Sequence, residues 1–114
     1  MIKVKRVYEP SARADGLRVL VDRVWPRGLS KAQTKIDLWV RDAAPSDALR
    51  KWFAHDPGKW PTFHRRYRAE LNGKRVLLQQ LKRLEREHRV LTLVYAASDT
   101  SRNNAVALAK MLGR

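Results

Sequence analysis

Alternating and continuous runs of apolar residues predict the strands of this chain. Residues 2–7 alternate between apolar and basic side chains, as in a strand with one solvated face at the edge of a sheet. The segments 17–24 and 90–97 each contain an unbroken apolar run, which is typical of a strand buried on both faces. Residues 36–40 fit either a short strand or the end of a helix, and the pattern does not choose between them.

Helical periodicity and capping residues predict the helices between these strands. Ser30 and Gln33 form a capping box for one short helical turn. Ser46 is a good N-cap, and Asp56 followed by proline is another, for helices whose apolar residues fall on one side. Two more helical segments complete the pattern, one over 74–88 and one that begins at Asn103.

The succession of strands and helices predicts an α/β fold. Two long apolar strands separated by helices indicate a small, open, mainly parallel sheet of about 3–4 strands flanked by about 4–5 helices. At 114 residues the chain has room for a single domain, spanning 1–114. It contains no cysteine, which excludes a disulfide scaffold, a thiolate zinc site, an iron–sulfur cluster and a cysteine nucleophile. Its three histidines lack metal-ligand spacing, so neither a metal nor another cofactor is expected.

The chain is strongly basic, with 25 Lys and Arg against 11 Asp and Glu and a formal net charge of +14. Ten Lys and Arg against three Glu place +7 of this charge between Lys59 and Arg89. Because such a field attracts phosphate-bearing partners, one hypothesis is a nucleic-acid-binding accessory protein that uses the basic helices 59–89. The side chains that would contact the polyanion are Arg65, Arg66, Lys74, Arg75, Lys82 and Arg83. The aromatic residues between them fit the core face, so no platform for stacking bases is visible.

The apolar segments are short. None reaches the roughly 20 residues needed to span a bilayer, and the first residues lack the apolar region of a signal peptide. We therefore expect a cytoplasmic protein without a membrane partner.

Polar segments follow both predicted buried strands. Residues 22–28 come after the first of them and residues 98–104 after the second. In open parallel sheets, ligands bind outside the carboxyl ends of the strands. If the two strands are parallel, these segments meet at one edge of the sheet, which is where a ligand is expected.

The second polar segment leads from a buried strand into a helix N-terminus, which can bind an anion through free backbone N–H groups. The geometry resembles the phosphate cradle of phosphatases and rhodaneses, and Ala96 and Arg102 have the separation of a nucleophile and its phosphate-binding arginine. Alanine cannot attack a substrate, so that chemistry is absent. Asp99 is also an obvious N-cap for the helix, and its carboxylate would compete with an anion.

In the first polar segment, Asp22 and Arg23 point to opposite faces of the strand. A charge that faces the interior needs a partner, so a salt bridge from Asp22 to a nearby arginine is slightly favoured over a role as general base. Arg27 beside Gly28 suits anion binding because a guanidinium binds phosphate or carboxylate with two hydrogen bonds. Trp25 either stacks on a ligand or covers the core, and the core is favoured.

His55 precedes Asp56 and Pro57, and it is the only histidine next to a carboxylate at a predicted loop. An imidazole near its ordinary pKa of about 6.5 could shuttle protons. The capping roles of the aspartate and the proline explain their own presence without any chemistry, but they leave His55 without an explanation.

Several blocks closely resemble the bacterial YeaO-like family, a domain of unknown function. They include Asp-Arg-Val-Trp-Pro-Arg-Gly at 22–28, Ala-Pro-Ser at 44–46, His-Asp-Pro at 55–57, Phe63 to Leu71 and Leu93 to Asp99. The resemblance runs essentially from end to end, and it implies no reaction. The family pattern opens the last helix with Asn-His, whereas this chain has Asn103 and Asn104, which weakens any enzymatic role for that position.

The favoured hypothesis is a site for a small phosphorylated or otherwise anionic ligand at the carboxyl ends of the strands. Its binding residues would be Arg23, Trp25, Arg27, Gly28, Ser98, Asn103 and Asn104. The domain would be either an enzyme or a non-catalytic sensor. In the first case the candidate acid–base groups are Asp22, His55 and Asp99.

Overall fold

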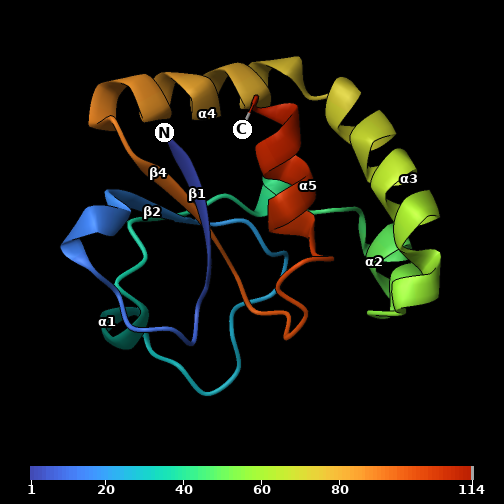
Figure 1. Ribbon diagram of the computed structural model, residues 1–114, viewed down its shortest axis with the longest axis horizontal. Coiled ribbons are helices and arrows are strands. Elements are labelled where there is room, and N and C mark those ends of the chain that lie inside the picture. Colours follow the sequence, from blue (N-terminus) through green and yellow to red (C-terminus); the bar gives the residue numbers. More distant parts are fainter. Residues whose placement is uncertain (114) are drawn as a thin grey trace.

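The computed structural model describes residues 1–113, and its four strands form one parallel sheet (Figure 1). The strands are β1 (Ile2–Arg6), β2 (Leu17–Leu20), β3 (Leu38–Trp39) and β4 (Leu91–Tyr95), in the order β1-β4-β2-β3. All three pairings are parallel. The predicted α/β class with a small parallel sheet is confirmed, as is the edge position of the first strand. The segment 36–40 provides a strand rather than the end of a helix.

Residues 1–113 also form five α-helices. They are α1 (Lys31–Thr34), α2 (Asp47–Phe53), α3 (Trp60–Asn72), α4 (Arg75–His88) and α5 (Asn104–Met111). α5 packs on β1 and β4, α4 packs on β2 and β4, and α3 lies beside α5 (Figure 1). None of these helices combines the length and the apolar character needed to cross a membrane.

The predicted caps form as expected because their side chains bind free backbone N–H groups. The Ser30 hydroxyl accepts a hydrogen bond from the Gln33 N–H (3.2 Å), and the Gln33 side chain accepts one from the Ser30 N–H (2.7 Å). The Ser46 hydroxyl caps α2, and Asp56 caps the short turn that leads into α3. These contacts fix where α1, α2 and the turn before α3 begin.

The alternation of side chains across the sheet creates two hydrophobic clusters. Val19 and Leu93 face α2, α3, α4 and α5, in the larger cluster. Leu20 and Val94 face the other way, toward Ile36 and the segment that contains α1. The strands are therefore buried on both faces, as their unbroken apolar runs predict. β2 nevertheless ends at Leu20, earlier than position 24, because the chain turns there into the polar segment described below.

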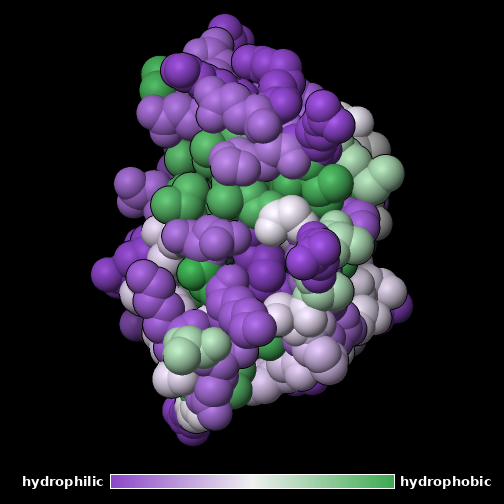
Figure 2. Space-filling model, turned by 90° about the vertical axis from the view of Figure 1, so that its left-hand side faces the viewer, coloured by the Kyte–Doolittle hydropathy of each residue, from purple (hydrophilic) through white to green (hydrophobic). Residues whose placement is uncertain are grey.

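α4 presents a hydrophilic surface to solvent. Figure 2 shows this surface as the purple top of the molecule, above a band of hydrophobic side chains. A groove of about 380 Å³ lies between α4 and the segment that contains β3, and its lining includes Leu38, Leu77 and Leu84 together with the polar side chains of Gln80, Arg83 and Glu87.

Among residues 1–113, one buried side-chain polar atom lacks a hydrogen-bond partner. It is Nε2 of His64, on α3. Its ring lies edge-on to Trp60, with the ring centroids 5.4 Å apart. Burial lowers the pKa of His64 below its ordinary value of about 6.5, and the positive charges of Lys110 and Arg68 lower it further. The fold therefore favours the neutral ring.

Replacing His64 with leucine is expected to reduce the loss of stability on mild acidification. In the unfolded chain His64 binds a proton near pH 6.5, whereas the folded chain binds it only at lower pH. Its contribution to the free energy of unfolding is thus complete above about pH 6.5 and declines as the pH falls below that value. Denaturant unfolding at a series of pH values between about 7 and 5 measures how the free energy of unfolding changes with pH. The same pH dependence in the wild-type protein and in the leucine variant would contradict a lowered pKa of His64.

Candidate functional site

The carboxyl ends of β2 and β4 border a pocket of about 400 Å³, here called the carboxyl-end pocket. Its lining comes from residues 22–27 after β2 and from residues 96–97 and 103–104 around the loop after β4. The other walls come from α2, α3 and the loop after β1. The two polar segments therefore converge at one edge of the sheet, as the carboxyl-end rule predicts.

Asp22 connects the two strand ends inside this pocket. Its Oδ2 accepts a hydrogen bond from the Ala96 N–H (2.9 Å), and its Oδ1 accepts one from Asn104 Nδ2 (3.0 Å). Asn104 Nδ2 also donates to the carbonyl of Val21 (3.0 Å). Burial raises the pKa of Asp22 above its ordinary value, and these hydrogen bonds together with the charge of His55 offset only part of that rise.

The expected salt bridge between Asp22 and an arginine does not form among the described residues. The nearest arginine in sequence, Arg23, instead donates from Nε to the carbonyl of Pro45 (3.1 Å). The prediction was wrong because two amide donors bind the carboxylate in place of a guanidinium. They are the Ala96 N–H just after β4 and the Asn104 side chain on α5, which only the tertiary fold brings close.

Three guanidinium groups belong to the lining of the pocket. Arg23 is partly buried and anchored to Pro45, while Arg27 and Arg50 are exposed. Arg50 pairs with Asp47 on its own helix (2.6 Å). The Arg27 guanidinium has no hydrogen-bond or ion-pair partner in the part of the chain that the structure describes; only its carbonyl is bound, by the Tyr8 hydroxyl (3.1 Å). An anion entering the pocket would thus meet positive charge.

Trp25 covers the smaller hydrophobic cluster, as the core interpretation predicts. Its Nε1 donates to the carbonyl of Leu29 (2.7 Å), and its ring meets Trp39 edge-on with the centroids 5.4 Å apart. One part of Trp25 also lines the pocket. Gly28, in contrast, turns the chain with a φ of 81° and does not line it.

The loop between β4 and α5 binds its own carboxylate. Asp99 Oδ1 accepts hydrogen bonds from the N–H groups of Ser101 (2.9 Å) and Arg102 (3.0 Å). These bonds, and the Arg102 guanidinium beside the other oxygen, lower the pKa of Asp99. The loop N–H groups that would hold an anion are therefore occupied from within, as the predicted competition requires.

Asp99 is not the N-cap of the last helix, contrary to the sequence-based prediction. Asn103 takes that role, because its side-chain oxygen accepts a hydrogen bond from the Val106 N–H (3.0 Å). Asn103 Nδ2 in turn donates to the carbonyl of Asp99 (2.9 Å). Asn103 is buried and held on both sides, so it shapes the pocket wall. Asp99 and Ser98 lie outside the lining.

His55 also lines the pocket, and its backbone is strained. Ala54 and His55 have φ values of 48° and 59°. These values lie in the left-handed region, which residues other than glycine rarely adopt. The end of α2 and the Asp56 cap hold this turn in place. This turn carries the only histidine in the pocket lining, and the charge of that histidine lowers the pKa of Asp22.

The structure brings seven of the ten candidate ligand and acid–base residues to the carboxyl-end pocket and leaves Gly28, Ser98 and Asp99 outside its lining. Sequence reasoning missed Arg50 and the aromatic wall formed by Phe53 and Phe63. These residues come from α2 and α3, and only tertiary packing places these helices over the sheet edge. Among residues 1–113, no group of three or more His, Asp or Glu could hold a metal ion.

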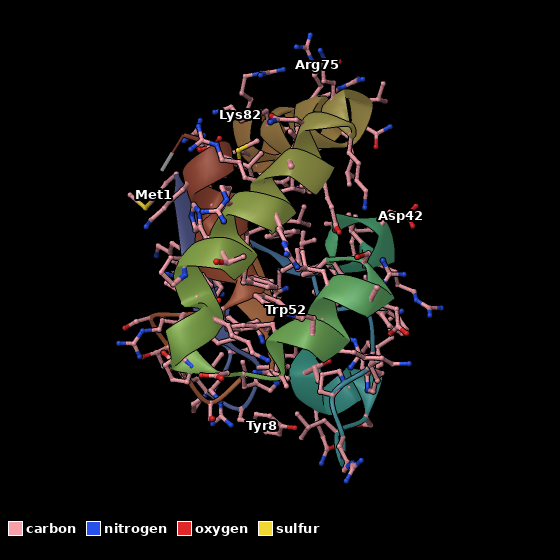
Figure 3. All side chains as sticks on the ribbon, turned by 90° about the vertical axis from the view of Figure 1, so that its right-hand side faces the viewer. Met1, Tyr8, Asp42, Trp52, Arg75 and Lys82 are labelled. Carbon is pink, nitrogen blue, oxygen red and sulfur yellow. The ribbon has the colours of Figure 1, made fainter. Side chains whose placement is uncertain are left out.

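Of the two basic helices, α4 lies at the end of the molecule away from the pocket, whereas α3 contributes Phe63 to the pocket lining. Figure 3 shows Arg75 and Lys82 at the top and Tyr8, which lines the pocket, at the bottom. Lys82 Nζ donates to the carbonyl of Leu112 (2.9 Å), and Lys74 Nζ donates to that of Asp42 (2.6 Å).

Two more of the six candidate polyanion contacts are also engaged within the chain. Arg66 lies over the Trp52 ring, and Arg83 pairs with Glu87 (2.9 Å). Only Arg65 and Arg75 have no such partner in the described part of the chain.

Comparisons with known proteins give the chain a family. The model of a family described as the inactive DUF488-N3 subclade matches residues 1–114. The uncharacterized protein YeaO of Escherichia coli is 42% identical over 113 residues, which cover 97% of this chain and 96% of that protein. The uncharacterized protein Rv3073c of Mycobacterium tuberculosis is 40% identical over 111 residues, covering 97% and 92%.

None of the solved structures matches the chain. The family model and both relatives nevertheless cover nearly all of its length, and the relative from Escherichia coli carries the name of the family that the sequence blocks resemble. This chain belongs to the YeaO-like proteins of the inactive DUF488-N3 subclade.

Proposed function

We propose that this domain binds a small anionic ligand, of the phosphorylated class, in the carboxyl-end pocket. The observation that carries the proposal is the exposed Arg27 guanidinium, which borders the pocket without a partner in the described residues. Arg23 and Arg50 add two more positive charges against the single carboxylate of Asp22. A guanidinium that no internal acid neutralises is suited to bind phosphate or carboxylate with two charge-assisted hydrogen bonds.

We further propose that the domain binds this ligand without transforming it. Ala96 occupies the place from which a nucleophile would act, before a loop that leads into a helix N-terminus. Asp99 is bound to the N–H groups of that same loop. The description of the family as inactive agrees with a role in binding.

Replacing Arg27 with alanine is expected to weaken the binding of ethyl phosphate about tenfold or more, because it removes a bidentate, charge-assisted contact. Isothermal titration or NMR titration at physiological salt measures the dissociation constant. The matched control is the double variant Lys82→Ala/Arg83→Ala, which removes two positive charges from α4, away from the pocket. Its affinity should stay within about twofold of that of the wild-type protein, since screening limits the effect of distant charges.

The second candidate function is nucleic-acid binding by the basic helices, favoured by the +7 charge of residues 59–89. The same variants test it with a short DNA duplex in place of ethyl phosphate. A polyanion site on α4 predicts that the double variant binds DNA more weakly, with a shallower dependence on salt. If ethyl phosphate binding falls equally in both variants, or only in the double variant, the proposed pocket function is wrong.

A further inference from the structure

The carboxyl-end pocket contains one carboxylate, that of Asp22, among its positive charges, and within residues 1–113 this carboxylate forms no ion pair. Asp22 receives hydrogen bonds from the Ala96 N–H and the Asn104 amide, both of which are neutral donors. Each carboxylate oxygen can accept a further hydrogen bond, so about two acceptor positions stay unused on this side chain. Arg23, next to it in sequence, is directed instead to the carbonyl of Pro45.

Asp15 shows how the same chain treats a buried carboxylate when the pairing is internal. It lies between Arg18 (2.7 Å) and Lys5 (3.1 Å), and both cations come from strands of the sheet. Asp22 lies at the end of such a strand, in a protein with 25 Lys and Arg, and pairs with none of those that the structure describes. Since an unpaired carboxylate away from water is unfavourable, a cation supplied from outside would stabilise it.

We infer that the ligand of this pocket is zwitterionic and carries, in addition to its anionic group, a protonated amine that pairs with Asp22. This inference rests on the proposed function, because it concerns the same pocket. The anionic group binds at the exposed arginines Arg27 and Arg50, and the amine lies inward, at the partly buried carboxylate. The rings of Phe53 and Phe63 form an apolar wall of the pocket, which suits the carbon skeleton between the two charged groups.

The test compares aminoethyl and aminobutyl phosphate with ethyl and butyl phosphate, because the two pairs differ only in the amine and cover two lengths. With the wild-type protein, at least one aminoalkyl phosphate is expected to bind about tenfold more tightly than its alkyl counterpart, as a close charge pair permits. N-acetylation of that compound, which removes its positive charge, should abolish the preference.

The variant Asp22→Asn should lose this preference and bind the two members of the pair with equal affinity, with folding checked by circular dichroism. The matched control is Asp42→Asn, which makes the same change of net charge at an exposed residue outside the pocket and should keep the preference. Equal binding of the amino and alkyl compounds to the wild-type protein would overturn the inference while leaving the proposed function intact, and so would a preference that survives N-acetylation. Failure of all four phosphates to bind would overturn the proposed function itself.

Discussion

Replacing Asp15 with alanine is expected to lower the free energy of unfolding by about 3–5 kcal/mol, because the change leaves Arg18 charged and buried without a counter-ion. Arg18 is 4% exposed, and its NH1 lies 2.7 Å from Asp15 Oδ2. Its Nε and NH2 donate to the carbonyl of Thr34, a neutral acceptor that does not compensate the charge. Chemical denaturation followed by tryptophan fluorescence measures the loss, which is large for a domain of ordinary stability.

Asp15 also connects several elements of the fold, so its loss is felt beyond a single pair. Its side chain accepts hydrogen bonds from Lys5 on β1 (3.1 Å) and from the Ala12 N–H (3.0 Å). Its carbonyl accepts a hydrogen bond from the Thr92 hydroxyl on β4 (2.6 Å). Asp15 thus links β1, β2 and β4 at the amino-terminal edge of the sheet, opposite the carboxyl-end pocket.

The matched control is Asp47→Ala, at an exposed aspartate that pairs with Arg50 and Lys51 on the surface of α2. Surface ion pairs contribute little to stability, so this variant should unfold close to the wild-type denaturant midpoint.

The stability of the protein in acid provides a second test of the role of Asp15. Burial raises the pKa of Asp15, but hydrogen bonds from Ala12, Lys5 and Arg18 lower it by more, so the net shift is downward.

Because its pKa is lowered in the folded state, Asp15 stabilises the protein above the ordinary aspartate pKa of about 3.9, and this contribution is lost as the pH falls further. The difference between wild type and Asp15→Ala should therefore shrink in acid. A variant that unfolds like the Asp47 control at neutral pH would show that Arg18 does not depend on this carboxylate.

The ion pair between Asp15 and Arg18 is a feature that the sequence did not predict. The segment that contains Asp15 has the composition of a solvated turn, and nothing in a single sequence distinguishes an exposed aspartate from one that points into a sheet. Arg18 interrupts the apolar pattern of β2, but the sequence does not show that its side chain is buried or which residue pairs with it. Ion-pair partners depend on which strands are neighbours in the sheet, and hydrophobic periodicity predicts burial but not strand order.

The elements and the position of the site were predictable because each depends on local physics or on a general rule. Unbroken apolar runs predicted β2 and β4, and caps such as Ser46 predicted the helix starts. Parallel strands bring their carboxyl ends together, which placed Asp22 and Asn104 at one edge before any contact was known. The contribution of α2, including Arg50, was not predictable because it depends on how that helix packs.

Replacing Gly16 with alanine is expected to cost about 2–4 kcal/mol, from backbone strain and overpacking together. Gly16 has a φ of 61° and a ψ of −133°, a conformation that residues with a Cβ avoid. A Cβ there would lie 2.4 Å from the carbonyl oxygen of Val90 and 2.7 Å from its Cβ. The same carbonyl accepts the Leu17 N–H (3.0 Å) at the start of the β2–β4 pairing, so the backbone cannot move aside without weakening the sheet.

Gly73→Ala is the matched control for this prediction, because it adds the same methyl group where the backbone tolerates it. Gly73 has a φ of −83°, in the helical region, and a Cβ there would lie 3.4 Å from the carbonyl oxygen of Glu70, an ordinary contact. Reducing the freedom of the unfolded chain should leave this variant as stable as wild type or more stable by up to about 1 kcal/mol. Denaturant midpoints of the two variants should therefore shift in opposite directions or differ widely. Equal midpoints would mean that the close approach of Gly16 to Val90 does not hold the edge of the sheet.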